Sequence, residues 1–437
     1  MKRSKILIGI SLLVLTLLTL VLNAFKSATD VESQVAITSI HHLKNVLVTK
    51  EKLLYKKHQD ELRDAINAYF DKAISAGDIV GAGVSIVKDD SIIISDGYGK
   101  RNTDRDALVD GGTIFRLGSL SKGFAGVLVA ELKDEGKLHW EDRISDFIPE
   151  FKFGNRDNTN KITLANILSH TAGTPYHSYT NLVEAGLPLQ DIAQRFKDIA
   201  PISEPGSMYS YQNAMFALCG EVILKATGKE ISEVLTNTFF NPLGMCSTTM
   251  DYETLAHTEN VAMPHSKRGN GWRTLPLTNN YYNAIAAGGI SASPDDMAKW
   301  MRFLLGYNPE LMSNSALAET FSPFIEIKGE SKYYQHWPGH RSSYYGYGWR
   351  IHKFMEEDSD QEKTIWHHGG SVNDYRNEIA IYPEADLGIC VLLSNNSKIA
   401  KTVIPDLYAI VKEIYGQTTL PYQQPNIANH LVQLDLE

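Results

Sequence analysis

The order of the secondary-structure signals along this chain constrains its fold more than any other feature of the sequence. A helical apolar pattern over residues 50–76 stops at Gly77, and two β-rich runs over 80–87 and 92–95 follow it, joined by the polar turn 88–90. Helical spacing of apolar residues and a glycine at the end favour a helix, and β-branched residues around a polar turn favour a hairpin. We therefore expect a helix that lies against a two-stranded hairpin.

Strand signals return near the C-terminus. They cover residues 364–366, 378–382 and 388–393, and Pro383-Glu384-Ala385-Asp386 is a turn between the last two. A helical pattern over residues 404–415 follows them. The same kinds of element therefore open and close the globular part of the chain.

The middle of the chain, about residues 124–305, is mostly helical in pattern and is interrupted by Gly and Pro. Residues 333–347 are rich in Tyr and His and are predicted to be a loop region, whose aromatic residues either line a groove or pack in the core. These signals predict one globular part over 50–437 with an α/β (α+β) fold. Its α/β portions are expected at about 50–123 and 340–420, with the helical region inserted between them.

The first 26 residues predict a membrane segment rather than a part of the fold. Lys2, Arg3 and Lys5 precede a run without charge over residues 6–25. At 1.5 Å per residue this run reaches about 30 Å, which is the thickness of the hydrocarbon core of a bilayer. Cations before such a run favour an N-terminus that stays in the cytoplasm. Residues 1–26 are therefore interpreted as a signal anchor or a signal peptide.

Small residues are poorly placed for cleavage of this segment. A cut after Ala24 puts Leu22 at the third-last position, and a cut after Ala28 puts Lys26 there. An uncleaved anchor, an N-terminal membrane-spanning helix, is therefore favoured, and a polar linker over 27–49 follows it. The rest of the chain is expected to be extracytoplasmic, in the periplasm or at the cell surface, with the membrane as a partner.

Charge and cysteine content narrow the classes of function. The 42 Lys and Arg against 51 Asp and Glu give a net charge of −9, which disfavours nucleic acid as a partner. The three cysteines, Cys219, Cys246 and Cys390, are too few for a disulfide framework and have no metal-ligand spacing. Cys219 and Cys246 either pair in an oxidising compartment or remain small buried hydrophobic residues.

The first candidate for chemistry is the pair Ser119 and Lys122, in the run Phe115-Arg116-Leu117-Gly118-Ser119-Leu120-Ser121-Lys122. Residues three apart on a helix lie on one face, so the two side chains can form a hydrogen bond. If Ser119 begins the helix, the positive end of the helix dipole favours its alkoxide. Burial and the same field lower the pKa of Lys122, which lets a neutral amine act as a base. Alone, this spacing is common by chance.

Two further motifs carry polar groups. Tyr211 and Asn213 offer a phenol for proton transfer and an amide for a substrate carbonyl. Taken alone, an aromatic residue that caps the core beside a turn asparagine is the more common explanation of such a pair. His367-His368-Gly369-Gly370 lies on a predicted strand, where glycine marks a close approach of another backbone or a ligand. The two histidines point to opposite faces of a strand and cannot readily share a metal ion, so no metal site is expected.

Ser119-x-x-Lys122, Tyr211-x-Asn213 and His367-x-Gly369, in this order, resemble the motifs of the serine β-lactamase and penicillin-binding-protein superfamily. The branch is that of class C β-lactamases, D-Ala-D-Ala carboxypeptidases and related esterases, and the likeness runs from about residue 81 to 395. It also includes the runs Leu168–Gly173, Gly288-Gly289, Tyr345-Gly346-Tyr347-Gly348-Trp349 and Tyr382-Pro383-Glu384. The resemblance implies a β-lactamase/DD-peptidase-like fold, an antiparallel sheet flanked by helices with an all-helical region beside it.

The resemblance also implies roles for these residues. Ser119 would be the acylated nucleophile, Lys122 its proton acceptor, and Tyr211 the general base or relay for deacylation and for protonation of the leaving group. Asn213 would bind a substrate amide, and the N–H groups of Ser119 and Gly370 would form an oxyanion hole. The reaction would be a two-step acyl transfer that needs no metal or organic cofactor.

One residue departs from the pattern of the β-lactamases in this branch. They usually have Lys where this chain has His367, which at its ordinary pKa of about 6.5 is mostly neutral at pH 7. His367 with Gly369 and Gly370 is still expected to bind substrate, and Arg376 either supplies the missing charge or lies at the surface. The histidine form resembles peptidases and esterases of the family more than dedicated β-lactamases.

The sequence thus predicts an extracytoplasmic serine hydrolase, most like a D-Ala-D-Ala-type peptidase or an esterase. Its substrate would be a peptidoglycan-type D-peptide, an ester or a β-lactam. A class C-like β-lactamase is the first alternative. A membrane-tethered binding or scaffold protein that has lost turnover is the alternative from another class, since a fold does not guarantee activity.

Overall fold

The computed structural model describes residues 52–416, apart from 270, 330 and 357–359, and scattered positions between 16 and 26. The chain divides into two compact units, residues 1–62 and 63–437. Residues 52–62 of the first unit and residues 63–75 of the second unit are helical. This agrees with the helix expected before Gly77, whose φ of 70° marks the turn that ends it.

The predicted membrane segment and the linker over 27–49 lie outside the described residues, except for the few positions between 16 and 26. A search of the described residues alone finds no helix with both the length and the apolar character needed to cross a bilayer.

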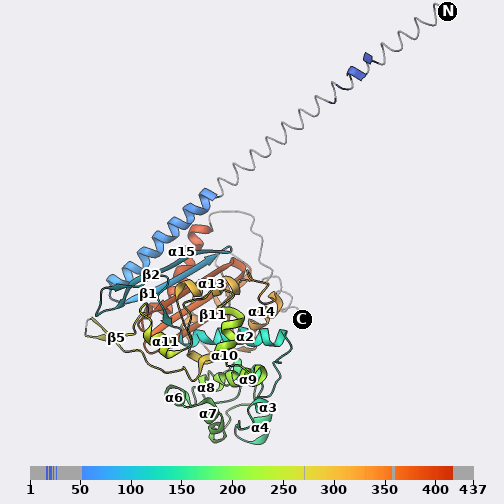
Figure 1. The fold of residues 1–437 in the computed structure, drawn as a ribbon, viewed down its shortest axis with the longest axis vertical. Coiled ribbons are helices and arrows are strands. Elements are labelled where there is room, and N and C mark those ends of the chain that lie inside the picture. The colour runs from blue at the N-terminus through green and yellow to red at the C-terminus, as the bar shows by residue number, and fades with distance from the viewer. Residues whose placement is uncertain are drawn as a thin grey trace, which may run out of the picture. The chain divides into compact units, whose positions relative to one another are not determined.

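One antiparallel sheet forms the centre of the second unit, and its strand order in the described residues is β3-β2-β1-β13-β12-β11-β10-β9-β8 (Figure 1). The strands are β1 (Gly81–Lys88), β2 (Ser91–Asn102), β3 (Ala107–Leu108), β8 (Ile325–Glu326), β9 (His340–Tyr345), β10 (Arg350–Met355), β11 (Glu362–Val372), β12 (Tyr375–Tyr382) and β13 (Leu387–Leu393). β1 pairs with β13, so the hairpin near the start and the strands near the end of the globular part share one sheet.

The sequence explains the β1–β2 hairpin and the central strand β13 well. Asp89 and Asp90 adopt φ of 50° and 65° between β1 and β2, as a two-residue hairpin turn requires. Every residue of β13 is buried, which suits a continuous apolar strand with helices over both faces. The turn 383–386 and the strands around it, expected from the sequence, are confirmed, although β2 and β11 are longer than their sequence signals.

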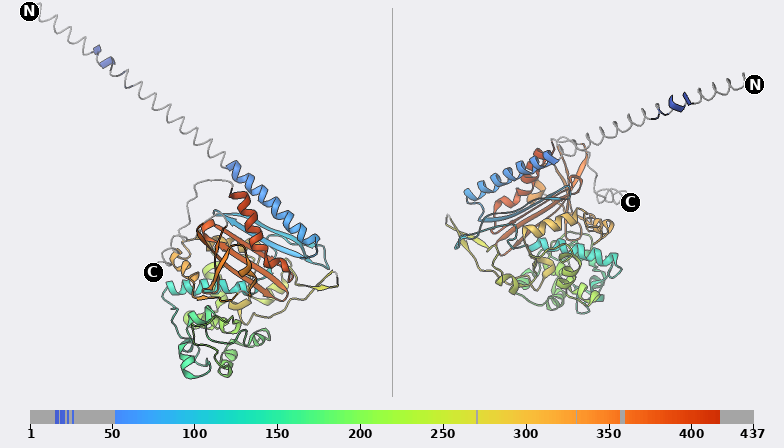
Figure 2. Two further views of the ribbon diagram at one scale, coloured as in Figure 1. Left: turned by 180° about the vertical axis from the view of Figure 1, so that it is seen from behind. Right: turned by 45° about the horizontal axis from the view of Figure 1, so that its top comes forward.

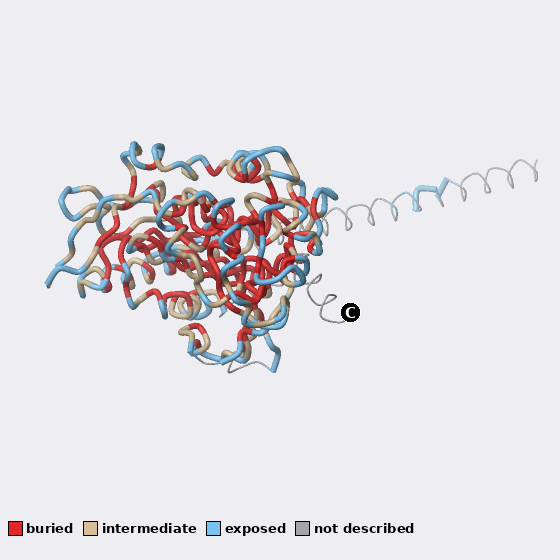
Figure 3. The backbone as a smooth tube through the Cα atoms, turned by 90° about the horizontal axis from the view of Figure 1, so that it is seen from below, coloured by how far each residue is buried: buried red, intermediate tan, exposed pale blue. Residues whose placement is uncertain are grey.

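Helices cover both faces of the sheet (Figure 2). On one face lie α15 (Val403–Tyr415) and the helix over 63–75, whose Tyr69 hydroxyl donates to Asp406 of α15 at 2.8 Å. On the other face lies α13 (Pro294–Leu304), which contacts β1, β2 and β13. α2 (Ser121–Asp134) lies on this side too, and its residues 121–130 are all buried. Figure 3 shows the buried backbone concentrated in the middle of the second unit.

The helical region follows α2 and is built from short helices. They are α3 (Ile144–Phe147), α4 (Arg156–Lys161), α5 (Leu164–Leu168), α6 (Thr180–Glu184), α7 (Leu189–Arg195), α8 (Asn213–Ala217), α9 (Cys219–Thr227), α10 (Ile231–Leu235), α11 (Tyr252–His257), α12 (Ile285–Gly288) and α14 (Asn314–Thr320). Shorter turns are η1 (Gly118–Leu120), η2 (Phe196–Asp198), η3 (Thr236–Phe240), η4 (Tyr333–His336), η5 (Pro383–Ala385) and η6 (Lys398–Lys401). Minor strands are β4 (Phe115–Arg116), β5 (His265–Arg268), β6 (Gly271–Thr274) and β7 (Ser291–Ala292).

Two expectations need correction. The stretch 333–347 is not wholly a loop, since it holds η4 and β9, and β9 pairs with β8 on one side and β10 on the other. The mostly helical stretch 124–305 contains the hairpin of β5 and β6 as well as β7. These strands are short, and their hydrogen-bond partners lie far away in the sequence or across a tight turn. Their own residues therefore show little of the alternating pattern of a strand.

The three cysteines are free. Cys219 and Cys390 are buried, as expected of small hydrophobic residues, whereas Cys246 is exposed. The structure therefore contains no bond between Cys219 and Cys246.

Candidate active site

Ser119 lies in the η1 turn that leads directly into α2, so the helix begins at Ser121 and not at Ser119 itself. The segment before it is fixed by two elements. Asn377 of β12 donates to the carbonyl oxygens of Arg116 and Leu117 at 2.8 and 3.1 Å, and the Leu117 N–H donates to Ile290. The Ser119 hydroxyl therefore stands at the N-terminal end of a 14-residue helix, where the dipole favours negative charge.

Lys122 is fully buried beneath Ser119, and its Nζ has three neighbours. Nζ lies 3.2 Å from Ser119 Oγ, 2.8 Å from Asn213 Oδ1 and 2.8 Å from the carbonyl oxygen of Ala287. Burial lowers the pKa of Lys122 well below its usual value, and the Arg350 guanidinium acts in the same direction. A neutral amine gives its two N–H groups to the two carbonyl oxygens, and its lone pair then faces the Ser119 hydroxyl.

The Tyr211 hydroxyl is a further polar neighbour of the nucleophile and donates to Ser119 Oγ at 2.9 Å. Burial raises the pKa of Tyr211, so its phenol is neutral at ordinary pH. Ser119 Oγ can therefore accept from Tyr211 while it donates to Lys122. This arrangement suits Lys122 as the proton acceptor and Tyr211 as a proton donor in the first step.

Asn213 is the first residue of α8 and lies beside Lys122. Its Oδ1 accepts from Lys122, and its Nδ2 donates to the Tyr281 hydroxyl at 3.2 Å and lies 3.5 Å from His177 Nδ1. Tyr211 and Asn213 therefore contact Ser119 and Lys122, the other two members of the predicted catalytic group. The structure brings together Ser119, Lys122, Tyr211 and Asn213, as the sequence predicts.

Gly369 and Gly370 lie on β11, where the strand passes the η1 turn. A Cβ at Gly370 would lie 2.1 Å from the carbonyl oxygen of Leu117, so only glycine allows this approach. The backbone of Gly370 is therefore a neighbour of the nucleophile turn, as the predicted oxyanion hole needs. Gly369 lines the cavity in front of Ser119.

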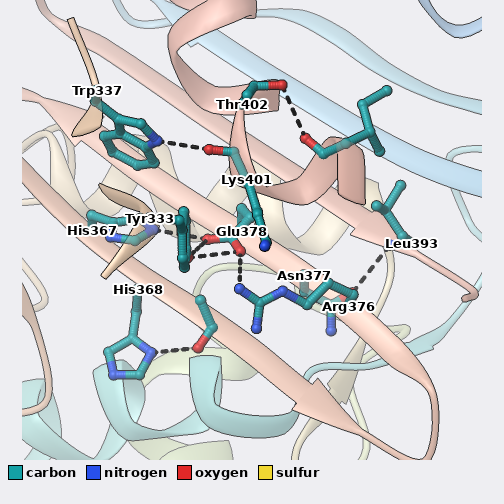
Figure 4. A network of polar contacts seen from close by, with 12 residues as sticks. Tyr333, Trp337, His367, His368, Arg376, Asn377, Glu378, Leu393, Lys401 and Thr402 are labelled. Carbon is teal, nitrogen blue, oxygen red and sulfur yellow. Dashed lines mark hydrogen bonds and ion pairs between the residues drawn. The ribbon is translucent and has the colours of Figure 1, made fainter. Parts of the chain in front are cut away.

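His367 and His368 point to opposite faces of β11, as expected (Figure 4). His367 is fully buried, lies 2.8 Å from Glu378 Oε2, and is not among the residues that line the cavity. Burial lowers its pKa well below the usual value, so it carries no charge to a substrate. The expectation that the His367 side chain binds substrate directly is therefore not supported, because the ring is used inside the sheet. Among the described residues, no cluster of three His, Cys, Asp or Glu side chains is placed to hold a metal ion.

A cavity of about 510 Å³ opens in front of Ser119 and carries several cations. Arg350, Arg376 and Lys332 line it, and the carboxylate in its lining is that of Glu184. Arg376 lines the cavity and is ion-paired with Glu378 at 2.8 Å, which corrects the alternative of a surface role.

Arg350 is the functional residue that sequence reasoning missed. Its guanidinium is buried, and its Nε and Nη1 have no hydrogen-bond partner among the described residues. The Cζ atom lies 5.1 Å from the centre of the Tyr334 ring and 5.9 Å from that of Tyr211, so aromatic faces surround the cation. Arg350 directly follows the motif run that ends at Trp349, and this proximity is the one hint in the sequence. Nothing in the local pattern shows that β10 places its side chain at the cavity.

Comparisons with known proteins agree with this geometry. A family model described as Beta-lactamase matches residues 66–411. Protein flp of Staphylococcus aureus (strain COL) is 23% identical over 350 residues, which cover 80% of this chain and 66% of that protein. Unguisins hydrolase ungD' of Aspergillus campestris (strain IBT 28561) is 27% identical over 296 residues, which cover 65% of this chain and 53% of that protein. The chain thus spans 66% and 53% of the length of these two curated relatives.

Among solved structures, the octameric penicillin-binding protein homologue from Pyrococcus abyssi has a similar fold, with a TM-score of 0.67 and 23% sequence identity. The likeness covers 81% of this chain and 80% of that one. The family model spans most of the chain, and every predicted site residue, from Ser119 to Gly370, lies inside the match. The chain therefore belongs to the β-lactamase family.

Proposed function

We propose that the chain is a serine hydrolase that forms an acyl-enzyme on Ser119. The observation that carries this proposal is the position of Ser119 Oγ, 3.2 Å from a buried Lys122 Nζ and 2.9 Å from the Tyr211 hydroxyl. An activated nucleophile needs a base within hydrogen-bond reach and a group that holds the base in place. Lys122 is that base, and Asn213 and Ala287 hold it.

In the acylation step, Ser119 Oγ bonds to the substrate carbonyl carbon and its proton passes to Lys122. The negative oxygen that forms is stabilised by the N–H groups of Ser119 and Gly370. Collapse of this intermediate breaks the bond to the leaving group, which takes the proton of the Tyr211 hydroxyl. Tyr211 regains a proton from Lys122, so the net transfer is from Ser119 to the leaving group. Water then attacks the acyl carbonyl carbon, and the ester bond to Ser119 Oγ breaks to release the acid. The proton lost by the water passes through Tyr211 and Lys122 to Ser119 Oγ, which is the reverse of the first route.

The favoured substrates are D-peptides of the D-Ala-D-Ala type and esters that carry a carboxylate. The support is the pair of guanidinium groups in the cavity, because Arg350 has unsatisfied N–H groups there and planar guanidinium groups match carboxylates. One relative is named as a hydrolase, which supports hydrolytic activity in general. A class C-like β-lactamase remains the runner-up, since a neutral His367 stands where those enzymes usually have a lysine.

A non-catalytic binding or scaffold protein is the alternative from another class. It is disfavoured because a binding site has no need of a buried, neutral lysine beneath a serine. Burying such an amine costs free energy, so its presence beneath Ser119 favours a catalytic role over binding alone. Function resides in the site rather than in the fold.

Covalent labelling separates these possibilities. The full chain is treated with a fluorophosphonate and, separately, with a labelled penicillin, and Ser119→Ala is compared with wild type. We expect label on wild type and on Ser207→Ala, a matched control at an exposed serine outside the cavity, and none on Ser119→Ala. Equal labelling of Ser119→Ala, or no label on wild type, contradicts the proposal. A substrate panel of D-peptides, esters and β-lactams then ranks the substrate classes.

We also propose that the catalytic part is extracytoplasmic and anchored by residues 6–25. The support is the uncharged run and the cations before it. Reporter enzymes that are active only outside the cytoplasm, fused after residue 416, test the orientation. Activity is expected, and an active cytoplasmic reporter at the same place contradicts it.

A further inference from the structure

A continuous line of hydrogen bonds crosses four neighbouring strands behind the cavity, from His340 on β9 to Glu378 on β12. His340 Nε2 lies 2.7 Å from Ser343 Oγ, and Ser343 Oγ lies 2.8 Å from His352 Nδ1. His352 Nε2 lies 3.0 Å from His367 Nδ1, and His367 Nε2 lies 2.8 Å from Glu378 Oε2. The last four members are buried, whereas His340 is partly exposed. The line therefore joins solvent to a buried carboxylate.

Glu378 connects this line to the cavity (Figure 4). Its carboxylate accepts from the Tyr333 hydroxyl at 2.8 and 2.9 Å and pairs with Arg376 Nη2 at 2.8 Å. Tyr333 and Arg376 both line the cavity. Gly369 is paired with Glu378 across the strands, and a Cβ there would lie 2.9 Å from Glu378 Oε2 and 2.8 Å from the Tyr333 hydroxyl. Because Gly369 has no side chain, Glu378 and the Tyr333 hydroxyl have space to contact each other here.

The hydrogen bonds of this line can all be donated in one direction or all in the other. When Glu378 is a carboxylate, His367 donates to it from Nε2, His352 donates to His367, Ser343 to His352, and His340 to Ser343. When Glu378 is protonated, it donates to His367, and each later bond reverses its direction. Every ring stays neutral and every bond is kept in both orders, since neutral imidazole has one donor and one acceptor nitrogen. The two states differ by one proton, which enters at His340 Nδ1 and ends on Glu378.

We propose that this line is a proton path that lets Glu378 alternate between carboxylate and acid, and that Glu378 thereby controls how strongly Arg376 attracts an anionic substrate. Glu378 is a positioning residue in this proposal, because it acts on the substrate only through Arg376. An ionised Glu378 neutralises the guanidinium. A protonated Glu378 leaves Arg376 as an uncompensated cation in the cavity wall.

The electrostatics agree with two accessible states. Burial raises the pKa of Glu378 to about 7, against the opposing effect of the neighbouring cations and of the Tyr333 hydrogen bond. Burial lowers the pKa values of His352 and His367 well below the usual value, which keeps both rings neutral. The charged and titratable groups that face Glu378 are Arg376 on β12, Tyr333 on η4, His367 on β11, Arg350 on β10 and Cys390 on β13. Lys401 of the adjoining η6 is exposed.

The tautomers of the two inner histidines test the path directly, and this test does not depend on the proposed hydrolase function. The full chain is labelled with ¹⁵N in its histidine rings, and the signals of His352 and His367 are assigned by single substitutions to Gln. Above a pH of about 7 we expect both rings as Nε2–H tautomers, and below it as Nδ1–H tautomers, neutral in each case. His265, a buried histidine outside the line, is the internal control and should not change tautomer with Glu378.

Glu378→Gln sharpens the test, because the amide N–H₂ of glutamine donates to His367 Nε2 as the acid does. The variant should hold both rings as Nδ1–H tautomers at every pH. Glu384→Gln is the matched control, since Glu384 is a second carboxylate, in the η5 turn after β12, that accepts from the Thr364 N–H and takes no part in the line. It should keep the transition of wild type. The titration of wild type needs the two assignment variants but not Glu378→Gln, so it still decides the matter if Glu378→Gln is unstable.

The consequence for substrates rests on the proposed function and is measured separately. As pH rises through about 7, KM for an anionic ester should increase, roughly tenfold for each pKa unit by which the bound anion shifts Glu378, while KM for a neutral ester stays constant. Glu378→Gln should keep the low KM throughout. Imidazolium signals, or tautomers that do not change with pH in wild type, overturn the path. A KM ratio that is independent of pH in an active enzyme overturns the control of Arg376.

Discussion

Replacement of Tyr211 by Phe separates the two roles that its hydroxyl has in this site. The ring contacts His170 at 4.2 Å between centres and is buried, so Phe keeps the packing and removes only the O–H. With an amide substrate, the variant loses the proton donor to the leaving nitrogen, and general acid catalysis of this kind is worth about 10²–10⁴ in rate, or about 3–5 kcal/mol. With an activated aryl ester, the leaving group needs no proton. Only the hydrogen bond to Ser119 is then lost, at about 0.5–1.5 kcal/mol.

The assay compares kcat/KM of wild type and Tyr211→Phe on an amide and on an activated ester with the same acyl group. We expect the ratio of amide to ester activity to fall by roughly tenfold or more. Tyr179→Phe is the control, because its hydroxyl also makes one hydrogen bond, to the Arg195 carbonyl oxygen, but lies outside the cavity. Equal losses on both substrates refute the role of Tyr211 as proton donor.

Three further predictions follow from the same geometry. Because burial lowers the pKa of Lys122, the free amine exists well below the usual range of lysine. With a neutral ester, kcat/KM should therefore keep its plateau well below the usual lysine pKa and fall only as pH drops through the lowered value. An acid limb near the usual lysine pKa in a pH–rate profile contradicts this. Gly370→Ala should displace the turn at Leu117 and lower the free energy of unfolding in urea by about 1–3 kcal/mol. It should also slow acylation. Unchanged stability and unchanged labelling argue against the close approach. Arg350→Met should raise KM for a carboxylated ester about 10- to 100-fold, since hydrogen bonds to charged groups are worth about 1.5–3 kcal/mol. KM for a neutral ester should change little. Equal effects on both esters refute carboxylate binding by Arg350.

The fold could be read from the sequence where local signals are strong. The aspartates at 89 and 90 fit the turn of a hairpin, and the uniformly apolar β13 is recognisable as a central strand. The strand β9 could not be read, because its pairing depends on β8 and β10 rather than on its own residues. Ser119, Lys122 and Tyr211 were found because their chemistry requires fixed spacing within motifs.

The rest of the site depends on contacts between residues far apart in the chain. Arg350 reaches the cavity because β10 lies beside β11, and no local pattern encodes that position. His367 looked like a substrate contact because its motif lies at the active site. Its partner Glu378 lies on the next strand, and this pairing draws the ring into the sheet. Such a displacement follows from tertiary packing, which a motif does not contain.

The central claim is that Ser119 becomes acylated during turnover. The most direct measurement is the mass of the chain, quenched in acid while it hydrolyses a carboxylated aryl ester, followed by mapping of the modified peptide. We predict a mass increase of one acyl group per chain, on the peptide that contains Ser119, together with a burst of the leaving phenol of equal size. Steady hydrolysis without any covalent adduct, or an adduct on another residue that persists in Ser119→Ala, would contradict the account.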